Sequence, residues 1–330
     1  GKSAVNYSCY FGATNNNYPQ FAQLDKHRVC GVKLFMGSST GNMLVDRMAS
    51  LRNIFGGTDL LIAAHCEDQG IIKENTDKYK KAYGDDVPLT LHPVIRSEEA
   101  CYRSSELAVQ LAREANARLH IMHISTAREL DLFSDAPLIT KRITAEACVS
   151  HLLFTEDDYQ TLGARIKCNP AIKTAEDRKA LQEAVNSGLI DAIATDHAPH
   201  LLSEKEGGAL KAMSGMPMIQ FSLASMLELV DKDIFSIEKI VEKMSHAPAQ
   251  MYEINNRGFI HKGYQADLVL VRPNSKWTVT TDCIVSKCQW SPLEGHTFNW
   301  KVEKTFVNGH LLYDNGKIDE TYRGQELRFR

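Results

Sequence analysis

The sequence lacks the features that mark nucleic-acid-binding, membrane or exported proteins. Its 330 residues carry a formal net charge of −3, with both signs interspersed and no basic stripe, which argues against a nucleic-acid partner. The apolar runs are too short to cross a bilayer, and no signal peptide is recognisable. We therefore expect neither nucleic acid nor a membrane as a partner.

Closely spaced cysteine pairs are also missing. No C-x-x-C motif occurs, and several cysteines lie within apolar runs. This distribution fits reduced thiols in a cytoplasmic protein better than a disulfide framework. The eight cysteines are Cys9, Cys30, Cys66, Cys101, Cys148, Cys168, Cys283 and Cys288.

A Gly-rich dinucleotide-binding turn is absent, although strand-like and helical segments alternate. Because repeated βα units without that turn favour a barrel over a doubly wound sheet, we expect an α/β fold of the (β/α)8 TIM type. Ser97 and Ser236 are expected to cap helices. Strands are expected near 29–36, 60–65, 118–124, 143–148 and 190–195, and helices at 97–115, 177–185, 219–229 and 236–244.

The barrel is expected to occupy residues 1–262 and to be incomplete at its N-terminus, because fewer than eight clear βα units precede residue 262. The segment 4–7 is also strand-like. Beyond residue 262 the pattern changes to short strands, and Asn308-Gly309 is a hairpin signal. This predicts a small all-β module, a β-sandwich, over 263–330, with strands at 263–271, 277–279, 302–307 and 311–313.

Four strand-like runs end on groups that can bind a metal: Lys33, His65, His123 and Asp196. The carboxyl ends of strands converge on the active site in such folds, so we expect these groups to share one metal-centred pocket. If 119–123 is a strand, His120 and His123 point to opposite faces and His123 is the better ligand.

Lys33 interrupts an otherwise buried strand, so it must be paired with a carboxylate, neutral or modified. A neutral amine can take up carbon dioxide to form a carbamate that bridges two cations. Asp196 lies in the strongest local signal, 194–200, and can bind metal with one oxygen and shuttle a proton with the other. His200 is placed to touch an anionic substrate. The alternative is a capping aspartate with surface histidines.

Two loops carry candidate substrate-binding groups. The turn at 214–218 offers free backbone amides, those of Gly215 and Met216, and the Asn169 side chain can both donate to and accept from a substrate amide. Each of these residues can equally be an ordinary loop residue. The loop 37–42 suits a mobile lid or a solvated turn, and we expect the turn.

Together these motifs resemble the cyclic amidohydrolases, and the dihydroorotase group in particular. Residues 31–36 resemble the family's carboxylated-lysine strand, and 65–68 and 123–126 resemble its two later histidine strands. Residues 194–200 resemble the catalytic-aspartate strand in its dihydroorotase form. Residues 169–170 and 214–217 resemble the substrate loops, and 291–295 resemble the C-terminal signature. The motifs occur in the family's order from about residue 30 to the end.

One family motif has no counterpart here. The family begins with a His-x-His strand that holds the more buried metal, followed by an arginine that holds the substrate carboxylate. None of the twelve histidines forms a His-x-His. We expect the first barrel strand and the front half of the β module to lie upstream of residue 1.

The resemblance implies a dihydroorotase, which reversibly hydrolyses the cyclic amide of dihydroorotate to N-carbamoyl-aspartate in pyrimidine biosynthesis. It implies two zinc ions bridged by carboxylated Lys33 and a hydroxide, with His65 and His123 on one ion and Asp196 on the other. Hydroxide would attack the ring carbonyl, Asp196 would act as general acid and base, and His200 and Asn169 would orient the substrate. The resemblance also implies a homo-oligomer, a dimer or tetramer.

Two other readings stay open. The chain can be another cyclic amidase, an allantoinase or hydantoinase, with the same metal core and a different substrate pocket. It can also be a non-catalytic dihydroorotase-like subunit that serves as a scaffold. Metal content separates this last reading from the enzyme, which should hold about two zinc ions per chain.

Overall fold

The centre of the fold is a parallel sheet of six strands. The computed structural model describes residues 2–37 and 43–330, so most of the loop 37–42 lies outside the described residues. Each strand pairs in parallel with the next one along the chain. The strands are β1 (Cys9–Gly12), β2 (Val29–Met36), β3 (Ile62–Cys66), β4 (Leu119–Ile121), β5 (Ile143–Cys148) and β6 (Ala192–Ala194).

This strand order is that of a barrel wall, because a doubly wound sheet reverses its order at a switch point and this one does not. Within the described residues β1 and β6 are the two edges of the sheet, so the six strands form part of a wall. The prediction of a parallel α/β fold is confirmed, and closure into eight strands stays a prediction. The expected strand at 4–7 is wrong: Tyr7 makes only an isolated bridge to Glu326, and the strand lies at Cys9–Gly12.

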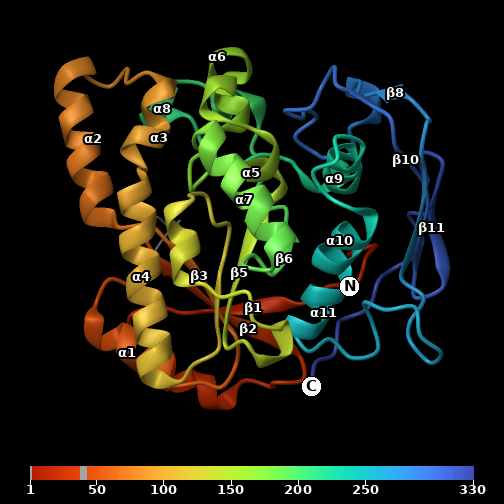
Figure 1. Ribbon diagram of the computed structural model, residues 1–330, viewed down its shortest axis with the longest axis horizontal. Helices are drawn as coiled ribbons and strands as arrows, with labels where there is room; N and C mark the ends of the chain where they lie inside the picture. The colour runs from red at the N-terminus through yellow and green to blue at the C-terminus, as the bar shows by residue number, and fades with distance from the viewer. Residues whose placement is uncertain (1, 38–42) are drawn as a thin grey trace.

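Helices cover the outer face of the sheet (Figure 1). β2 and β3 are buried along most of their length because their alternate residues pack on helices on one side and line the interior on the other. The helices are α1 (Met48–Gly56), α2 (Gln69–Tyr83), α3 (His92–Ile95), α4 (Glu98–Ala115), α5 (Val149–Leu153), α6 (Tyr159–Leu162), α7 (Ala175–Ser187), α8 (Gly208–Lys211), α9 (Ser222–Asp231), α10 (Ile237–Val241) and α11 (Ala247–Met251).

The predicted helices are present, with their expected caps. The Ser97 hydroxyl accepts the Ala100 N–H at the start of α4, and the Ser236 hydroxyl accepts the Lys239 N–H at the start of α10. The helix predicted over 236–244 is α10 followed by a π-helical turn, Glu242–His246, and then α11. No helix in the described part of the chain is long and apolar enough to span a membrane. All eight cysteines are free in the structure.

The C-terminal region forms a second, antiparallel sheet. Its strand order is β12-β11-β10-β7, and Asn308 and Gly309 turn the predicted β10–β11 hairpin. In Figure 1, α9, α10 and α11 lie between the parallel strands and this second sheet. The C-terminal strands are β7 (Leu268–Arg272), β8 (Trp277–Thr278), β9 (Thr297–Phe298), β10 (Lys301–Val307), β11 (His310–Asp314) and β12 (Lys317–Ile318).

The short β8–β9 pair does not join the antiparallel sheet. It packs instead beside the start of α9, where the rings of Trp277 and Phe298 lie 6.0 and 6.3 Å from that of Phe221. Val279, Trp290 and Phe298 accordingly belong to the same hydrophobic core as the parallel strands. A domain boundary near residue 262 and a sandwich over 263–330 stay predictions.

Candidate metal centre and substrate loops

Side chains of four neighbouring strands point to the inner face of the parallel sheet. The register pairs Lys33 with Ala63, Ala63 with His120, and Phe35 with His65. Because side chains alternate along a strand, Lys33, His65 and His120 share one face. On this face His120 contacts Glu146 of β5, and the His120 Nε2 lies 3.0 Å from the Glu146 Oε2.

His123 reaches the same region by a different route. β4 ends at Ile121, and His123 adopts a left-handed backbone conformation with φ of 41°. Such a conformation is uncommon for a histidine and frequent at functional sites. The expectation that His120 and His123 face opposite sides is therefore wrong, because strand alternation stops before His123.

The two candidate histidine ligands are in contact. His65 Nδ1 lies 3.1 Å from His123 Nε2, and both side chains are buried. His65 Nε2 lies 2.9 Å from the Glu67 Oε2 but without hydrogen-bond alignment, and the buried His123 Nδ1 has no partner among the described residues. Burial, with the neighbouring charges of His65 and Lys33, lowers the pKa of His123 well below its usual value. A neutral imidazole with an unpartnered nitrogen is the form that binds a metal.

Lys33 has no carboxylate within ion-pairing distance in the described part of the chain. Its Nζ lies 2.7 Å from Met122 Sδ and 4.6 Å from the centre of the Phe35 ring. Burial lowers the pKa of Lys33, although the charges of Glu146 and Asp196 oppose the shift. The alternative in which Lys33 pairs with a carboxylate is therefore wrong among the described residues. The alternatives of a neutral or a modified Lys33 amine stay open.

Asp196 lies two residues beyond β6 and shares the left-handed conformation of His123, with φ of 41°. It is accessible to solvent, yet the surrounding protein raises the pKa of its carboxyl by desolvation, aided by Glu146 and opposed by His65 and Lys33. Asp196 thus lies within electrostatic reach of His65 and Lys33.

Of the four candidate ligands, His65 and His123 are in direct contact. Within residues 2–37 and 43–330, no three His, Cys, Asp or Glu side chains form a group that could hold a metal ion, so a shared metal centre that includes Lys33 stays a prediction. The unpartnered nitrogen of His123 and the unpaired amine of Lys33 fit a carboxylated lysine and a bound cation.

Glu146 is a site residue that sequence reasoning missed. It is 5% exposed, and besides pairing with His120 its Oε1 accepts the His123 N–H at 3.4 Å. It also acts on the pKa values of Lys33 and Asp196. The signal was a charged residue inside the apolar run 143–148, which is the same argument that singled out Lys33.

The predicted substrate loops lie against the segment that follows Asp196. Met216 bridges to His197, and the Ala198 N–H donates to the Met216 carbonyl at 3.2 Å. A Cβ at Gly215 would lie 3.2 Å from His200 Cδ2, so Gly215, Met216 and His200 are close neighbours.

Asn169 lies on the adjoining loop, two residues beyond Lys167, whose carbonyl accepts the Gly215 N–H at 2.8 Å. The Asn169 Oδ1 is buried and has no partner among the described residues. A buried oxygen without a partner is costly, and a bound ligand is one means of satisfying it. The structure thus brings the predicted loop residues to one region.

Replacing Gly215 by Ala is expected to destabilise the protein by more than about 1 kcal/mol. Gly215 has φ of 131°, and a Cβ there would lie 2.4 Å from the Ala198 carbonyl oxygen. Gly316→Ala is the matched control, because Gly316 also has positive φ (94°) but no atom within reach of a Cβ. Urea unfolding of both variants measures the difference, and equal losses would show that the contact with Ala198 is unimportant.

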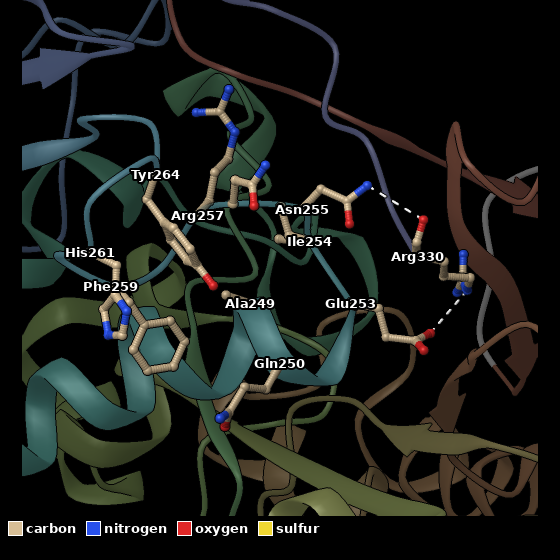
Figure 2. A pocket seen from close by; sticks show the side chains of 11 residues that line it. Ala249, Gln250, Glu253, Ile254, Asn255, Arg257, Phe259, His261, Tyr264 and Arg330 are labelled. Carbon is tan, nitrogen blue, oxygen red and sulfur yellow. Dashed lines mark hydrogen bonds and ion pairs between the residues drawn. The ribbon is translucent and has the colours of Figure 1, made fainter.

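A separate surface cavity of about 490 Å³ lies beside α11 and the C-terminal Arg330 (Figure 2). None of the predicted site residues lines it. Two of its charged groups are in ion pairs, since Arg330 Nε lies 2.9 Å from Glu253 and Arg257 pairs with Asp267.

Comparison with known proteins places this arrangement in a family. The model of the amidohydrolase family matches residues 46–312. The chain belongs to the amidohydrolase family. Members of this family generally bind metal ions.

The curated relatives of this amidohydrolase include dihydroorotases and allantoinases. A dihydroorotase of Clostridioides difficile is 38% identical over 205 residues, which is 62% of this chain and 48% of the relative. A dihydroorotase of Halobacterium salinarum is 30% identical over 90% of this chain and 67% of the relative. An allantoinase of Bacillus velezensis is 27% identical over 96% of this chain and 70% of the relative.

Among solved structures, an L-hydantoinase (dihydropyrimidinase) of Arthrobacter aurescens superposes with a TM-score of 0.91 at 25% identity. The match covers 99% of this chain and 74% of that one. This amidohydrolase thus spans about half the length of the C. difficile relative and about three quarters of the solved hydantoinase. The resemblance inferred from the motifs is confirmed, and the comparisons support a hydrolase that acts on cyclic amides.

Proposed function

We propose that the protein is a dihydroorotase, which reversibly hydrolyses dihydroorotate to N-carbamoyl-aspartate in pyrimidine biosynthesis. The observation that carries the proposal is the contact between the buried imidazoles of His65 and His123, together with a buried Lys33 amine that has no carboxylate partner among the described residues. Asp196, beyond the end of β6, is coupled electrostatically to His65 and Lys33. Two observations support dihydroorotate as the substrate. Residues 194–200 resemble the dihydroorotase form of the catalytic-aspartate strand, and several relatives are named dihydroorotase. Its substrate is a small molecule, its location the cytoplasm and its assembly a homo-oligomer, a dimer or tetramer.

The metal ligands of this chain would be His65, His123, Asp196 and Lys33, the last as a carbamate. Zinc ions, when bound, supply the Lewis acidity that lowers the pKa of a water molecule and polarises a carbonyl oxygen. Asp196 takes up a proton on its carboxylate as the ring amide is attacked and passes it to the leaving nitrogen.

The loop residues hold the substrate in place. The Asn169 amide can donate to and accept from the ring amide, which would satisfy its buried Oδ1. The Gly215 and Met216 segment contributes backbone groups, and His200 contacts the anionic end of the substrate. Glu146 fixes His120 and reinforces the position of His123 through its backbone N–H.

A second candidate, an allantoinase or hydantoinase, is favoured by two observations. The allantoinase relative spans 96% of this chain, and the structural neighbour at TM-score 0.91 is a hydantoinase. The metal ligands would be the same, and only the groups that contact the ring substituents would differ.

A panel of cyclic amides tests the proposal. The full-length protein, loaded with zinc, is assayed with dihydroorotate, allantoin and hydantoin at matched concentrations. We expect kcat/KM to be highest for dihydroorotate by at least about 10²-fold, because a site built to hydrogen-bond one substrate rejects analogues that leave its polar groups unpaired. A preference for allantoin or hydantoin would overturn the choice of substrate, and the absence of both zinc and turnover would favour the scaffold reading.

A further inference from the structure

Two buried lysines join the segments that carry the substrate-binding residues. Lys205 lies on the 3-10 turn Leu202–Lys205 and is 5% exposed. Its Nζ donates to three backbone carbonyls: those of Lys167 at 3.1 Å, Met213 at 2.6 Å and Gly215 at 2.6 Å. Its three donors are therefore all used to hold chain segments that are distant in sequence.

Lys167 completes the junction from the other side. It is 4% exposed, and its Nζ donates to the Ala212 carbonyl. Its carbonyl accepts both the Lys205 ammonium and the Gly215 N–H. The loop 212–215 is thus fastened to the 167–169 loop by two lysine side chains and one backbone hydrogen bond.

Neither lysine has a carboxylate within ion-pairing distance in the described residues, which is unusual for buried ammonium groups. Burial lowers the pKa of Lys205 and that of Lys167 to about 8. An apolar side chain would avoid this cost but would leave buried carbonyls unpaired. Burying these two ammonium groups costs desolvation free energy, and the hydrogen bonds that they make to the loop carbonyls offset this cost.

Lys205 also adjoins the third substrate segment. The Trp290 ring lies 6.0 Å from the Lys205 Nζ, and the Trp290 indole N–H donates to the His200 carbonyl at 2.8 Å. Lys205 therefore lies where the segments of Asn169, Gly215 and His200 meet.

We propose that Lys205 is a positioning residue. Its ammonium holds residues 213–216, the part of the 212–215 loop that continues to Met216, against the 167–169 loop, and thereby fixes the substrate-binding groups of both. The proposal rests on the function proposed above, because that function assigns these loops to substrate. Among the described residues, the Lys205 ammonium donates to backbone carbonyls and to none of the candidate metal ligands, so it acts through the loops that it joins.

Hydrogen exchange measures the junction without reference to activity. In the full-length protein, Lys205→Met is expected to speed amide exchange in peptides covering 213–216 by at least about tenfold, because local opening then costs less free energy. Lys211→Met is the matched control, because Lys211 is an exposed lysine on α8 whose ammonium pairs with Asp86. Lys205→Arg, which keeps the charge and several donors, should restore part of the protection. Lys167→Met serves as a second variant if Lys205→Met does not fold. Unchanged exchange in the variants at 205 and 167 would overturn the proposal.

Steady-state kinetics then connect the junction to substrate. In Lys205→Met, KM for dihydroorotate should rise about tenfold or more, while kcat and zinc content change less than about threefold. Faster exchange with unchanged KM would contradict the substrate-positioning role. If the unsubstituted protein turns over no cyclic amide, the proposed function fails, and exchange alone decides whether Lys205 holds the two loops together.

Discussion

Replacing Asp196 by Asn is expected to lower kcat for ring opening of dihydroorotate by about 10²- to 10⁴-fold. An amide has nearly the shape of the carboxylate but cannot accept the proton that must move to the leaving nitrogen. Asn also tolerates the left-handed conformation that Asp196 adopts, so the backbone should be preserved. The assay is steady-state hydrolysis by the full-length protein, with zinc content measured on the same samples.

The matched control is Asp233→Asn. Asp233 is likewise an aspartate with positive φ, 57°, but it lies exposed in the turn after α9. Its replacement should leave kcat unchanged. If Asp196→Asn retains zinc and hydrolyses dihydroorotate within about tenfold of the unsubstituted rate, the proton-shuttle role is wrong.

The largest effect on stability is expected from Arg96→Met, which should reduce the free energy of unfolding by about 3–5 kcal/mol. Glu67 is fully buried beneath His65, and the Arg96 guanidinium makes two hydrogen bonds to its carboxylate, one of them at 2.9 Å. Removal of Arg96 leaves that carboxylate buried without its principal counter-charge. Urea unfolding measures the change.

The double variant Glu67→Gln with Arg96→Met separates the stranded charge from lost packing. It should be more stable than Arg96→Met alone, because no ionised group is then buried without a partner. Arg128→Met, which breaks the solvent-exposed pair with Glu99, is the surface control and should behave as an ordinary surface substitution. A double variant no more stable than Arg96→Met would contradict this explanation.

The same pair sets a dependence on pH. Burial alone would raise the pKa of Glu67, but the charge of Arg96, together with His65, outweighs burial and holds it well below its usual range. A carboxyl with a lowered pKa in the folded state contributes stability above its unfolded value, near about 4.3, and loses it as the pH falls toward the folded value. The stability difference between the unsubstituted protein and Glu67→Gln should therefore shrink below about pH 4.

The strands, and the candidate metal ligands at their carboxyl ends, could be predicted from the sequence because both depend on local pattern. The run 60–65 is apolar and short and ends on His65, so a buried strand with a polar end could be predicted, and β3 (Ile62–Cys66) is observed there. The hairpin at Asn308-Gly309 followed in the same way from turn chemistry. Parallel pairing then brings such ends together, which the contact of His65 with His123 shows.

What could not be predicted depends on backbone geometry and on distant partners. Strand alternation assigned His120 and His123 to opposite faces, but β4 ends early and His123 turns back with positive φ. The role of Lys205 was invisible because its partners are backbone carbonyls, which any residue supplies. Arg96 was missed for a similar reason: its partner, Glu67, lies on a different segment 29 residues away.

The most direct test of the metal centre is an anomalous-difference map measured at the zinc edge from crystals of the full-length protein. The account predicts peaks bounded by His65, His123, Lys33 and Asp196, with zinc about 2.0–2.1 Å from the imidazole nitrogens. It also predicts additional density on the Lys33 Nζ that joins it to the metal. Absence of a peak between His65 and His123 in zinc-loaded crystals, or ligation of zinc elsewhere in the chain, would contradict it.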